Sequence, residues 1–210
     1  MGNCIKMDDE YILLQKKQDD IVVDIGQLDE EELHRYNRYI DSNKKAEFLA
    51  GRCFLKQELS KMVQMPPHDI RISLSANGKP YHTGSRLASP HFNLSHSNGV
   101  LVIAFSKFPI GVDIAFQSDV SIESLQPFLS DKELAVLNDQ TETEQKESLI
   151  HLFTMKEAFI KATDKVWGLD LISFNWNQDG WQLWQPVENC SFKIHKTKEH
   201  FISICLLKNE

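Results

Sequence analysis

Helical and strand patterns occur in both parts of the chain, because the pattern partly begins again in the second part. This partial repetition restricts the possible folds more than any single motif. In the first half, a polar helical stretch at residues 29–63 precedes an apolar strand at residues 100–105. After Pro109 a strand pattern begins again and is followed by helical stretches. We therefore expect an α+β chain of two halves, residues 1–107 and residues 108–210. A dinucleotide-binding fold is disfavoured because neither half shows a βαβ series with a G-x-G-x-x-G turn.

Local signals predict the elements of the first half. Residues 29–63 should form two helices that break near residues 41–43, because Asp, Ser and Asn cap helices and form turns. An alternating apolar pattern that leads into Asn77 and Gly78 predicts a hairpin with an exposed turn.

A polar loop that contains Ser95 and His96 should lead into the strand at residues 100–105. The second half is then expected to contain, in order, a strand at 110–116, a helix at about 121–137, a polar stretch at 138–146, a long helix at 147–165 and strands near 190–207.

The composition favours a globular protein of the reducing cytoplasm. The chain of 210 residues is 41% hydrophobic and 25% charged, and its net charge of −7 argues against a general nucleic-acid binder. No apolar run approaches the ~20 residues needed to span a bilayer, so no membrane association is expected. The four cysteines, Cys4, Cys53, Cys190 and Cys205, are scattered, which predicts free thiols without a zinc site or a redox pair.

The stretch "FTMKEAFIKATDKVWG" at residues 153–168 carries charges inside an apolar helical pattern. Because each helical residue turns by about 100°, Glu157 and Lys161 share one face and Lys156 flanks it. Taken alone, such a pair is commonly a solvated helix face that contributes a few tenths of a kcal/mol, roughly 0.2–0.5. A catalytic interpretation therefore needs support from other segments.

Asp113 in "GVDIA" offers a second carboxylate from a strand. Since strand side chains alternate, Asp113 points away from its two apolar neighbours. Asp113 and Glu157 could share one Mg²⁺ while water and phosphate oxygens complete its octahedral shell. Lys156 and Lys161 would supply point charges for other phosphate oxygens. An Asp that merely caps a turn would fit the same position.

Polar residues of the first half suggest a phosphate or base contact. His96 and Ser95 lie near the exposed turn at residues 78–80 and could hydrogen-bond a nucleotide, although a lone loop histidine is more commonly a surface residue. The first half also carries a basic cluster, which by default is the solvated side of a helix: Lys44, Lys45 and Arg52.

Six segments together resemble the 4′-phosphopantetheinyl transferase family in order and approximate spacing. They are "LAGR", "NGKP", "FNLSHS", "IGVDIA", "FLSDKE" and "FTMKEAFIKA", and they span roughly residues 40–175. The chain looks like the surfactin-synthetase type, in which two similar halves occupy one chain. The most specific parts are G-[IV]-D-I, K-E-[AS]-x-x-K and the [IL]-S-H-S segment.

The resemblance implies a fold and a reaction. Two similar α+β halves would form a pseudo-dimer in a single monomeric, cytoplasmic chain, with coenzyme A in the cleft between them. The family transfers the 4′-phosphopantetheine arm of coenzyme A to a serine of an apo acyl or peptidyl carrier protein. It uses Mg²⁺ and releases adenosine 3′,5′-bisphosphate. Which carrier, and whether lipid or secondary-metabolite biosynthesis is served, stays open.

The resemblance also assigns roles to residues. Asp113 and Glu157 would bind the metal, and Lys161 with Lys156 would contact the diphosphate. Glu157 is the first candidate for the base that accepts the serine proton, and Glu133 is the second. The remaining coenzyme A contacts would come from Lys44, Lys45, Arg52, Gly78, Lys79, Pro80, Ser95 and His96.

The chain departs from the family pattern at Ala115, where a second acid often follows the aspartate. Alanine cannot coordinate a cation, so we expect weaker metal affinity. A catalytically impaired module that binds coenzyme A or a carrier is therefore the alternative to the transferase. A magnesium-dependent phosphate-ester hydrolase is a third hypothesis, disfavoured because such enzymes carry more carboxylates around paired metals.

Carrier docking is expected to use a local apolar and basic surface, since the chain and typical carriers are both acidic. Extra residues at 163–170 could alter the pantetheine or carrier edge, or simply form a longer surface loop. The expected docking segment is residues 116–130, although a place in the core is favoured for most of its apolar residues. The candidates are Phe116, Leu125, Phe128 and Leu129.

Overall fold

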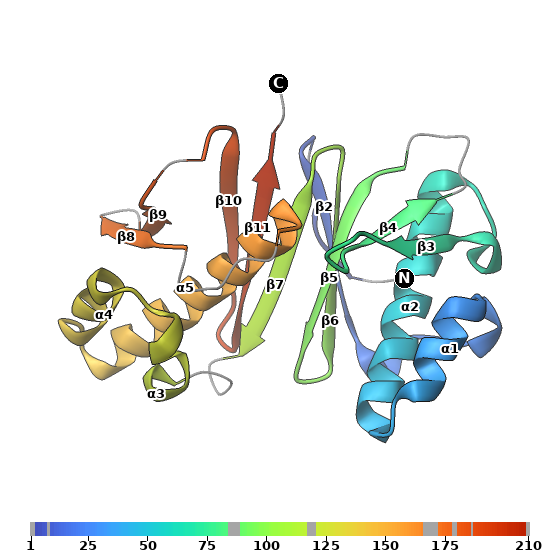
Figure 1. Ribbon diagram of the computed structural model, residues 1–210, viewed down its shortest axis with the longest axis horizontal. Coiled ribbons are helices and arrows are strands. Elements are labelled where there is room, and N and C mark those ends of the chain that lie inside the picture. The colour runs from blue at the N-terminus through green and yellow to red at the C-terminus, as the bar shows by residue number, and fades with distance from the viewer. Residues whose placement is uncertain are drawn as a thin grey trace. The chain divides into compact units, whose positions relative to one another are not determined.

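The computed structural model describes residues 3–7, 9–83, 89–116, 121–165, 172–177, 180–185 and 187–208. The chain divides into two compact units, Met1–Lys107 and Phe108–Glu210. Each unit combines an antiparallel sheet with one helix of 22 residues (Figure 1). The expected α+β class is confirmed by this mixture of helices and antiparallel strands.

The first unit contains a four-stranded antiparallel sheet in the order β1-β2-β6-β5 and a separate β3–β4 hairpin. Its strands are β1 (Asn3–Met7), β2 (Tyr11–Lys17), β3 (Arg71–Leu74), β4 (Pro80–Thr83), β5 (His91–Ser97) and β6 (Val100–Ser106). Its helices are α1 (Glu30–Arg38) and α2 (Ser42–Val63), with short 3-10 helices at Gln18–Asp20, Ile25–Gln27 and Pro67–Asp69.

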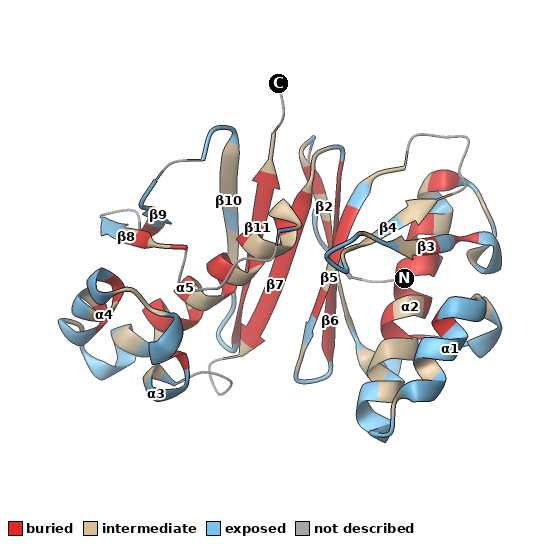
Figure 2. Cartoon of the chain, viewed as in Figure 1, coloured by how far each residue is buried: buried red, intermediate tan, exposed pale blue. Residues whose placement is uncertain are grey.

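Helix α2 forms the core of the first unit with the sheet. Phe54, Leu55 and Leu59 of α2 are fully buried in one cluster with Phe92 of β5 and Ile103 of β6. Figure 2 shows the buried side of α2 and the buried strand β6 in red, whereas α1 is mostly exposed. The sheet and α2 therefore hold each other in place.

The break between α1 and α2 falls where the sequence predicts it. The Asp41 side chain accepts hydrogen bonds from the backbone N–H groups of Asn43 and Lys44, and thereby starts α2. The predicted hairpin is also confirmed, because β3 pairs with β4 and Gly78 adopts a positive φ of 87° in the turn.

The second unit contains a three-stranded antiparallel sheet in the order β10-β11-β7 and a separate β8–β9 hairpin. Its strands are β7 (Ile110–Phe116), β8 (Phe174–Asn177), β9 (Gly180–Leu183), β10 (Cys190–Lys196) and β11 (His200–Leu207). Its helices are α3 (Ile122–Leu125), α4 (Asp131–Asn138) and α5 (Glu142–Thr163), with a 3-10 helix at Gln126–Phe128.

Helix α5 packs unusually closely on strand β7. A Cβ atom at Gly111 of β7 would lie 2.0 Å from the carbonyl oxygen of Ala158 and 2.4 Å from the backbone nitrogen of Ala162. Only glycine fits between the strand and this part of the helix. Because strand side chains alternate, Asp113 points to the same face as Gly111 and therefore toward α5.

Strand β11 links α5 to the same face of the sheet. Ser203 of β11 lies opposite Asp113 of β7, and its hydroxyl is 2.6 Å from the hydroxyl of Thr154 on α5. Both residues are fully buried, and their hydroxyl groups form a hydrogen bond with each other. The helix is thus held over the strand by a polar contact as well as by apolar packing.

Two expectations for the local structure are wrong. Ser95 and His96 lie in strand β5 and not in a loop, with Ser95 buried and His96 exposed. The expected single helix at 121–137 is divided into α3 and α4, because Pro127 stands in a 3-10 turn between them.

The long helix also begins earlier than predicted. Residues 138–146 were expected to be polar connecting chain, but α5 starts at Glu142. Thr141 and Glu144 form a capping box there, since each side chain bonds the backbone N–H of the other residue. In the described parts of the chain, no helix has the length and apolar character needed to cross a membrane.

Candidate active site

The acid predicted on the strand contacts a base predicted on the helix. The Nζ atom of Lys161 on α5 donates a hydrogen bond to Oδ1 of Asp113 on β7 at 2.5 Å. The Asp113 side chain is 8% exposed and that of Lys161 27% exposed, so the ion pair lies at the border of the interior. The structure therefore brings these two predicted residues together.

Glu157 belongs to the same electrostatic neighbourhood. It lies one turn before Lys161 on α5 and is partly buried. Burial raises the pKa of the Glu157 carboxyl, the Lys161 ammonium opposes this rise, and the negative charge of Asp113 adds to it. A carboxylate in this setting is stabilised by a nearby cation or by a proton that it accepts.

The other predicted pair, Lys156 and Glu133, is held inside the second unit. Lys156 Nζ lies 2.8 Å from Glu133 Oε2 and donates a further hydrogen bond to the carbonyl of Phe128 at 2.8 Å. Glu133 accepts from the backbone N–H groups of Ser130 and Phe174. Both side chains are almost completely buried.

These contacts give the buried pair a structural role. They tie α4, α5 and the start of β8 together, and each charge is paired and hydrogen-bonded as a buried charge must be. A direct contact of either residue with substrate stays a prediction.

Ala115 lies in an apolar environment. It forms a small buried cluster with Ile150 of α5 and Phe201 of β11. Among the described residues no group of three or more His, Cys, Asp or Glu side chains is placed to hold a metal ion. The two carboxylates of Asp113 and Glu157 still suit Mg²⁺, which commonly uses one or two protein carboxylates together with water and phosphate oxygens.

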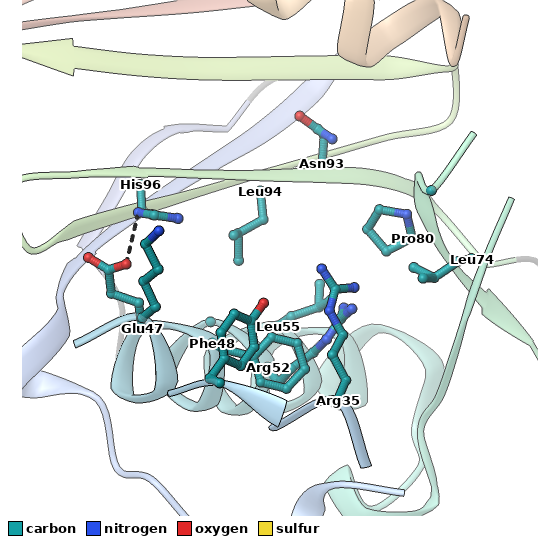
Figure 3. Close-up of a pocket in the computed structure, with 14 residues that line it drawn as sticks. Arg35, Glu47, Phe48, Arg52, Leu55, Leu74, Pro80, Asn93, Leu94 and His96 are labelled. Atoms are coloured by element: carbon teal, nitrogen blue, oxygen red, sulfur yellow. Dashed lines mark ion pairs between the residues drawn. The ribbon is translucent and has the colours of Figure 1, made fainter. Parts of the chain in front are cut away.

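The first unit contains a pocket of about 400 Å³ between helices α1 and α2, strand β5 and the β3–β4 hairpin. Figure 3 shows His96 and Leu94 of β5 opposite Phe48 and Arg52 of α2. His96 Nδ1 lies 3.9 Å from Glu47 Oε2, an ion pair whenever the histidine is protonated. Five of the residues predicted to bind the nucleotide line this pocket: Lys44, Arg52, Gly78, Pro80 and His96.

Three other predicted nucleotide contacts are not among the lining residues. Lys45 Nζ lies 4.4 Å from the centroid of the Tyr36 ring, and Ser95 is buried within β5. Lys79 is in the hairpin turn, where its backbone carbonyl accepts a hydrogen bond from Ser75.

Arg35 and Phe48 also line the pocket, although the sequence did not predict them as site residues. The guanidinium carbons of Arg35 and Arg52 lie 5.3 and 5.4 Å from the centroid of the Phe48 ring. Helical spacing could have indicated Phe48, because it shares one face of α2 with Lys44 and Arg52, four residues away on either side. Arg35 comes from α1, and no local signal connects it to α2.

The residues predicted for carrier docking separate into buried and exposed positions. Leu125 is 7% exposed and belongs to the core of the second unit, whereas Phe128 is 40% exposed. Phe116 and Leu129 are partly buried. Residues 117–120, within the expected docking segment, and residues 166–170, within the expected 163–170 loop, lie outside the described residues.

Comparison with known proteins reveals relatives along most of the chain. A family model described as "4'-phosphopantetheinyl transferase superfamily" matches residues 109–205, and one described as "4'-phosphopantetheinyl transferase, N-terminal" matches residues 15–108. The 4′-phosphopantetheinyl transferase Sfp of Bacillus subtilis (strain 168) is 33% identical over 167 residues, which cover 73% of this chain and 74% of that protein. The chain belongs to the 4′-phosphopantetheinyl transferase superfamily.

Further members of the superfamily agree with this assignment. The 4′-phosphopantetheinyl transferase ffp of Bacillus subtilis is 32% identical over 163 residues, which cover 78% of this chain and 70% of that protein. The 4′-phosphopantetheinyl transferase HetI of Nostoc sp. is 30% identical over 141 residues, which cover 65% of this chain and 59% of that protein. The resemblance seen in the sequence is confirmed, and this chain is an enzyme of the phosphopantetheinyl transferase class.

The two family matches divide the transferase near the boundary of its two units. The N-terminal match contains every residue that lines the pocket of the first unit. The superfamily match contains the acids and lysines of α5, α4 and β7, among them Asp113, Glu157 and Lys161. Each unit of the transferase thus carries its own group of candidate site residues.

Proposed function

We propose that this transferase moves the 4′-phosphopantetheine arm from coenzyme A to a serine of an apo acyl or peptidyl carrier protein. The observation that carries the proposal is the contact between Asp113 and Lys161 next to Glu157, on elements fixed by close packing. Phosphoryl transfer needs positioning and charge neutralisation more than covalent help from the protein, and this group offers both. The released product would be adenosine 3′,5′-bisphosphate.

We assign the nucleotide end of coenzyme A to the pocket of the first unit. Arg35, Lys44 and Arg52 give this pocket positive charge, while Leu55 and Leu94 supply apolar surface for a base. Its volume of about 400 Å³ falls in the range of small-molecule sites. Binding of coenzyme A in the cleft between the two halves, as the resemblance implies, is part of the proposal.

Asp113 and Glu157 would hold the Mg²⁺ ion that the family uses. When bound, the ion supplies positive charge that neutralises the diphosphate as the phosphorus–oxygen bond breaks. Position 115, where the family often has a further acid, is an alanine in an apolar cluster and offers no carboxylate. We therefore expect weak metal binding in the absence of coenzyme A.

The protein's own groups account for the proton and the leaving charge. The serine hydroxyl attacks the β-phosphorus, its proton passes to the Glu157 carboxylate, and the bond to adenosine 3′,5′-bisphosphate breaks. In the protein without the ion, burial raises the pKa of the Glu157 carboxyl, which suits a group that accepts a proton. Lys161 would donate hydrogen bonds to diphosphate oxygens. Glu133, fully buried with Lys156, is the second candidate for the base.

One observation favours the alternative function. Ala115 lies in an apolar cluster and has no side-chain atom that can bind a metal ion. Its presence suits a catalytically impaired module that binds coenzyme A or a carrier. We further propose that the protein acts as a monomer in the cytoplasm.

The test is to incubate the protein with coenzyme A, Mg²⁺ and an apo carrier protein and to weigh the carrier by mass spectrometry. We expect the carrier to gain one phosphopantetheine arm. Glu157→Gln should lower the rate at least about 100-fold, the usual contribution of a general base. Glu142→Gln is a matched control, because Glu142 pairs with Lys146 at the same i,i+4 spacing on an exposed part of α5.

The outcomes separate the three functions. An unmodified carrier despite tight coenzyme A binding would favour the impaired module. Breakdown of coenzyme A in a sample without carrier would favour a hydrolase. Near-normal turnover of Glu157→Gln would remove Glu157 as the base while leaving the transfer itself intact.

A further inference from the structure

Two cysteines that are distant in the sequence meet on neighbouring strands of the second unit. The Sγ atoms of Cys190 on β10 and Cys205 on β11 lie 3.5 Å apart without a disulfide between them. Cys190 lies opposite Leu207 and Cys205 lies opposite Phe192, so the two cysteines are diagonal neighbours on one face of the sheet. The scattered spacing in the sequence does not indicate this contact, and neither cysteine is in a disulfide, as the sequence predicts.

The two thiols have different surroundings. Cys205 is completely buried in the core of the second unit. Cys190 is partly buried and lines a pocket of about 390 Å³ together with His151, Trp181 and Phe192. A small molecule that enters this pocket can therefore reach the sulfur of Cys190, while Cys205 contacts that sulfur from the interior.

We propose that Cys190 and Cys205 form an oxidisable dithiol, with Cys190 as the thiol attacked by a peroxide and Cys205 as the resolving thiol. In the first step the Cys190 thiolate attacks one peroxide oxygen, becomes a sulfenic acid and releases water after protonation of the other oxygen. In the second step the Cys205 sulfur attacks the sulfenic sulfur and releases a second water. Two thiols are oxidised to one disulfide and the peroxide is reduced to water.

The contact also prepares the first thiol for reaction. A hydrogen bond from Cys205 lowers the pKa of the Cys190 thiol, and burial opposes this change. The thiolate is the nucleophile in reactions with peroxides, so a lowered pKa favours Cys190 over the buried Cys53, whose sulfur contacts the backbone of Asp24 and whose pKa burial raises.

Only a small movement separates the two thiols from a bond. A disulfide has a sulfur–sulfur length of about 2.0 Å, so the present 3.5 Å must shorten by about 1.5 Å. Strand β11 is the central strand of the sheet and pairs with β7, on which Asp113 lies. The disulfide would join β10 to β11, the strand that pairs with the strand of Asp113. Its formation does not depend on coenzyme A or on a carrier protein.

The experiment uses the full-length protein, fully reduced and then treated with graded hydrogen peroxide. Remaining thiols are alkylated, and the protein is analysed by intact mass and by peptide mapping. We expect a mass loss equal to two hydrogen atoms and a cross-linked peptide pair that contains Cys190 and Cys205. Dithiothreitol should reverse both changes.

Variants assign the roles of the two thiols. Cys190→Ser should abolish the cross-link, and Cys205→Ala should leave a sulfenic acid at Cys190 that a dimedone-type probe traps. Cys4→Ser is the control, because Cys4 is an exposed thiol on β1 of the other unit and its removal should leave the cross-link unchanged. A thermal melt of each variant confirms that it is folded, and the wild-type cross-link is measured independently of all variants.

The proposal is overturned if Cys190 and Cys205 both remain open to alkylation after unfolding while Cys4 has been oxidised. A disulfide that joins either residue to Cys4 or to a second chain would overturn it as well. Because neither readout depends on coenzyme A or a carrier, failure here is distinct from failure of the proposed transfer reaction.

Discussion

Replacement of Gly111 by alanine tests how strictly the packing of α5 on β7 determines the site. The added Cβ would lie 2.0 Å from the carbonyl oxygen of Ala158 and 2.4 Å from the backbone nitrogen of Ala162. Both are backbone atoms of a helix, so no side-chain rotation can relieve the contact. The helix must move away from the strand, or the strand must bend.

The size of the effect follows from these distances. To reach an ordinary contact of about 3.4 Å, the closest atoms must separate by about 1.4 Å, which is large for a packed interior. Added methyl groups in packed cores cost typically about 1–3 kcal/mol, and a backbone contact places Gly111→Ala at or above the upper end. Since α5 also carries Glu157 and Lys161, a shift of about 1 Å should reduce turnover by about 100-fold in the folded protein.

The assay combines urea unfolding with the rate of carrier modification at saturating coenzyme A. Gly51→Ala in α2 is the matched stability control, because its Cβ would meet side-chain atoms of Leu94 and Leu101 at 3.6–3.7 Å, an ordinary contact. That variant should be stabilised by about 0.5–1 kcal/mol through higher helix propensity. If Gly111→Ala unfolded at the wild-type urea concentration and kept wild-type turnover, the close packing of α5 on β7 would be refuted.

Three further predictions concern other parts of the molecule. Lys156→Met leaves the buried Glu133 carboxylate without its cation and should lower the free energy of unfolding by about 3–5 kcal/mol, measured by urea denaturation; the double variant with Glu133→Gln should lose less than the sum of the two single variants. The pKa of His151 is lowered from 6.5 to about 4, because burial and then Lys196 disfavour the charged ring. The unfolded chain therefore binds the proton first, and stability present above pH 6.5 should fall by up to about 3 kcal/mol as the pH drops to 4; His151→Phe should lack this fall when both proteins are unfolded in urea at each pH. Arg35→Leu removes a charge from the pocket of the first unit and should raise KM for coenzyme A about 10-fold, the loss of a charged hydrogen bond, with an unchanged melting temperature; an unchanged KM would exclude Arg35 from nucleotide binding.

Local chemistry predicted much of the fold. Asp41 predicts the start of α2, because short polar side chains accept hydrogen bonds from the first backbone N–H groups of a helix. Gly78 predicts the hairpin turn, because glycine readily adopts the positive φ that the turn has. Ser95 and His96 were misread because Phe92 and Leu94 give apolar alternation only in the first part of β5, whereas its last three residues are all polar. Pro127 could have indicated the break between α3 and α4, since proline disrupts a helix interior.

The site was only partly predictable for a related reason. Glu157 and Lys161 are one helical turn apart, so their common face follows from the sequence alone. Glu133 and Lys156 are 23 residues apart, and their burial as a pair depends on how α4 packs on α5. One local signal was available, because Ser130 and Glu133 have the S-x-x-E spacing of a capping box, which points the glutamate back toward the helix start.

The proposed chemistry depends on small residues as much as on charged ones. Aspartate has a short side chain, so Asp113 can bond Lys161 only if α5 lies close to β7. Gly111 on the strand, with Ala158 and Ala162 on the helix, removes the side chains that would hold the two elements apart. The same closeness partly buries Glu157 beside Asp113 and thereby raises its pKa. Gly111→Ala should therefore change the pKa of Glu157 in the protein that remains folded. The pH dependence of turnover in this variant, compared with that of the wild type, measures the change.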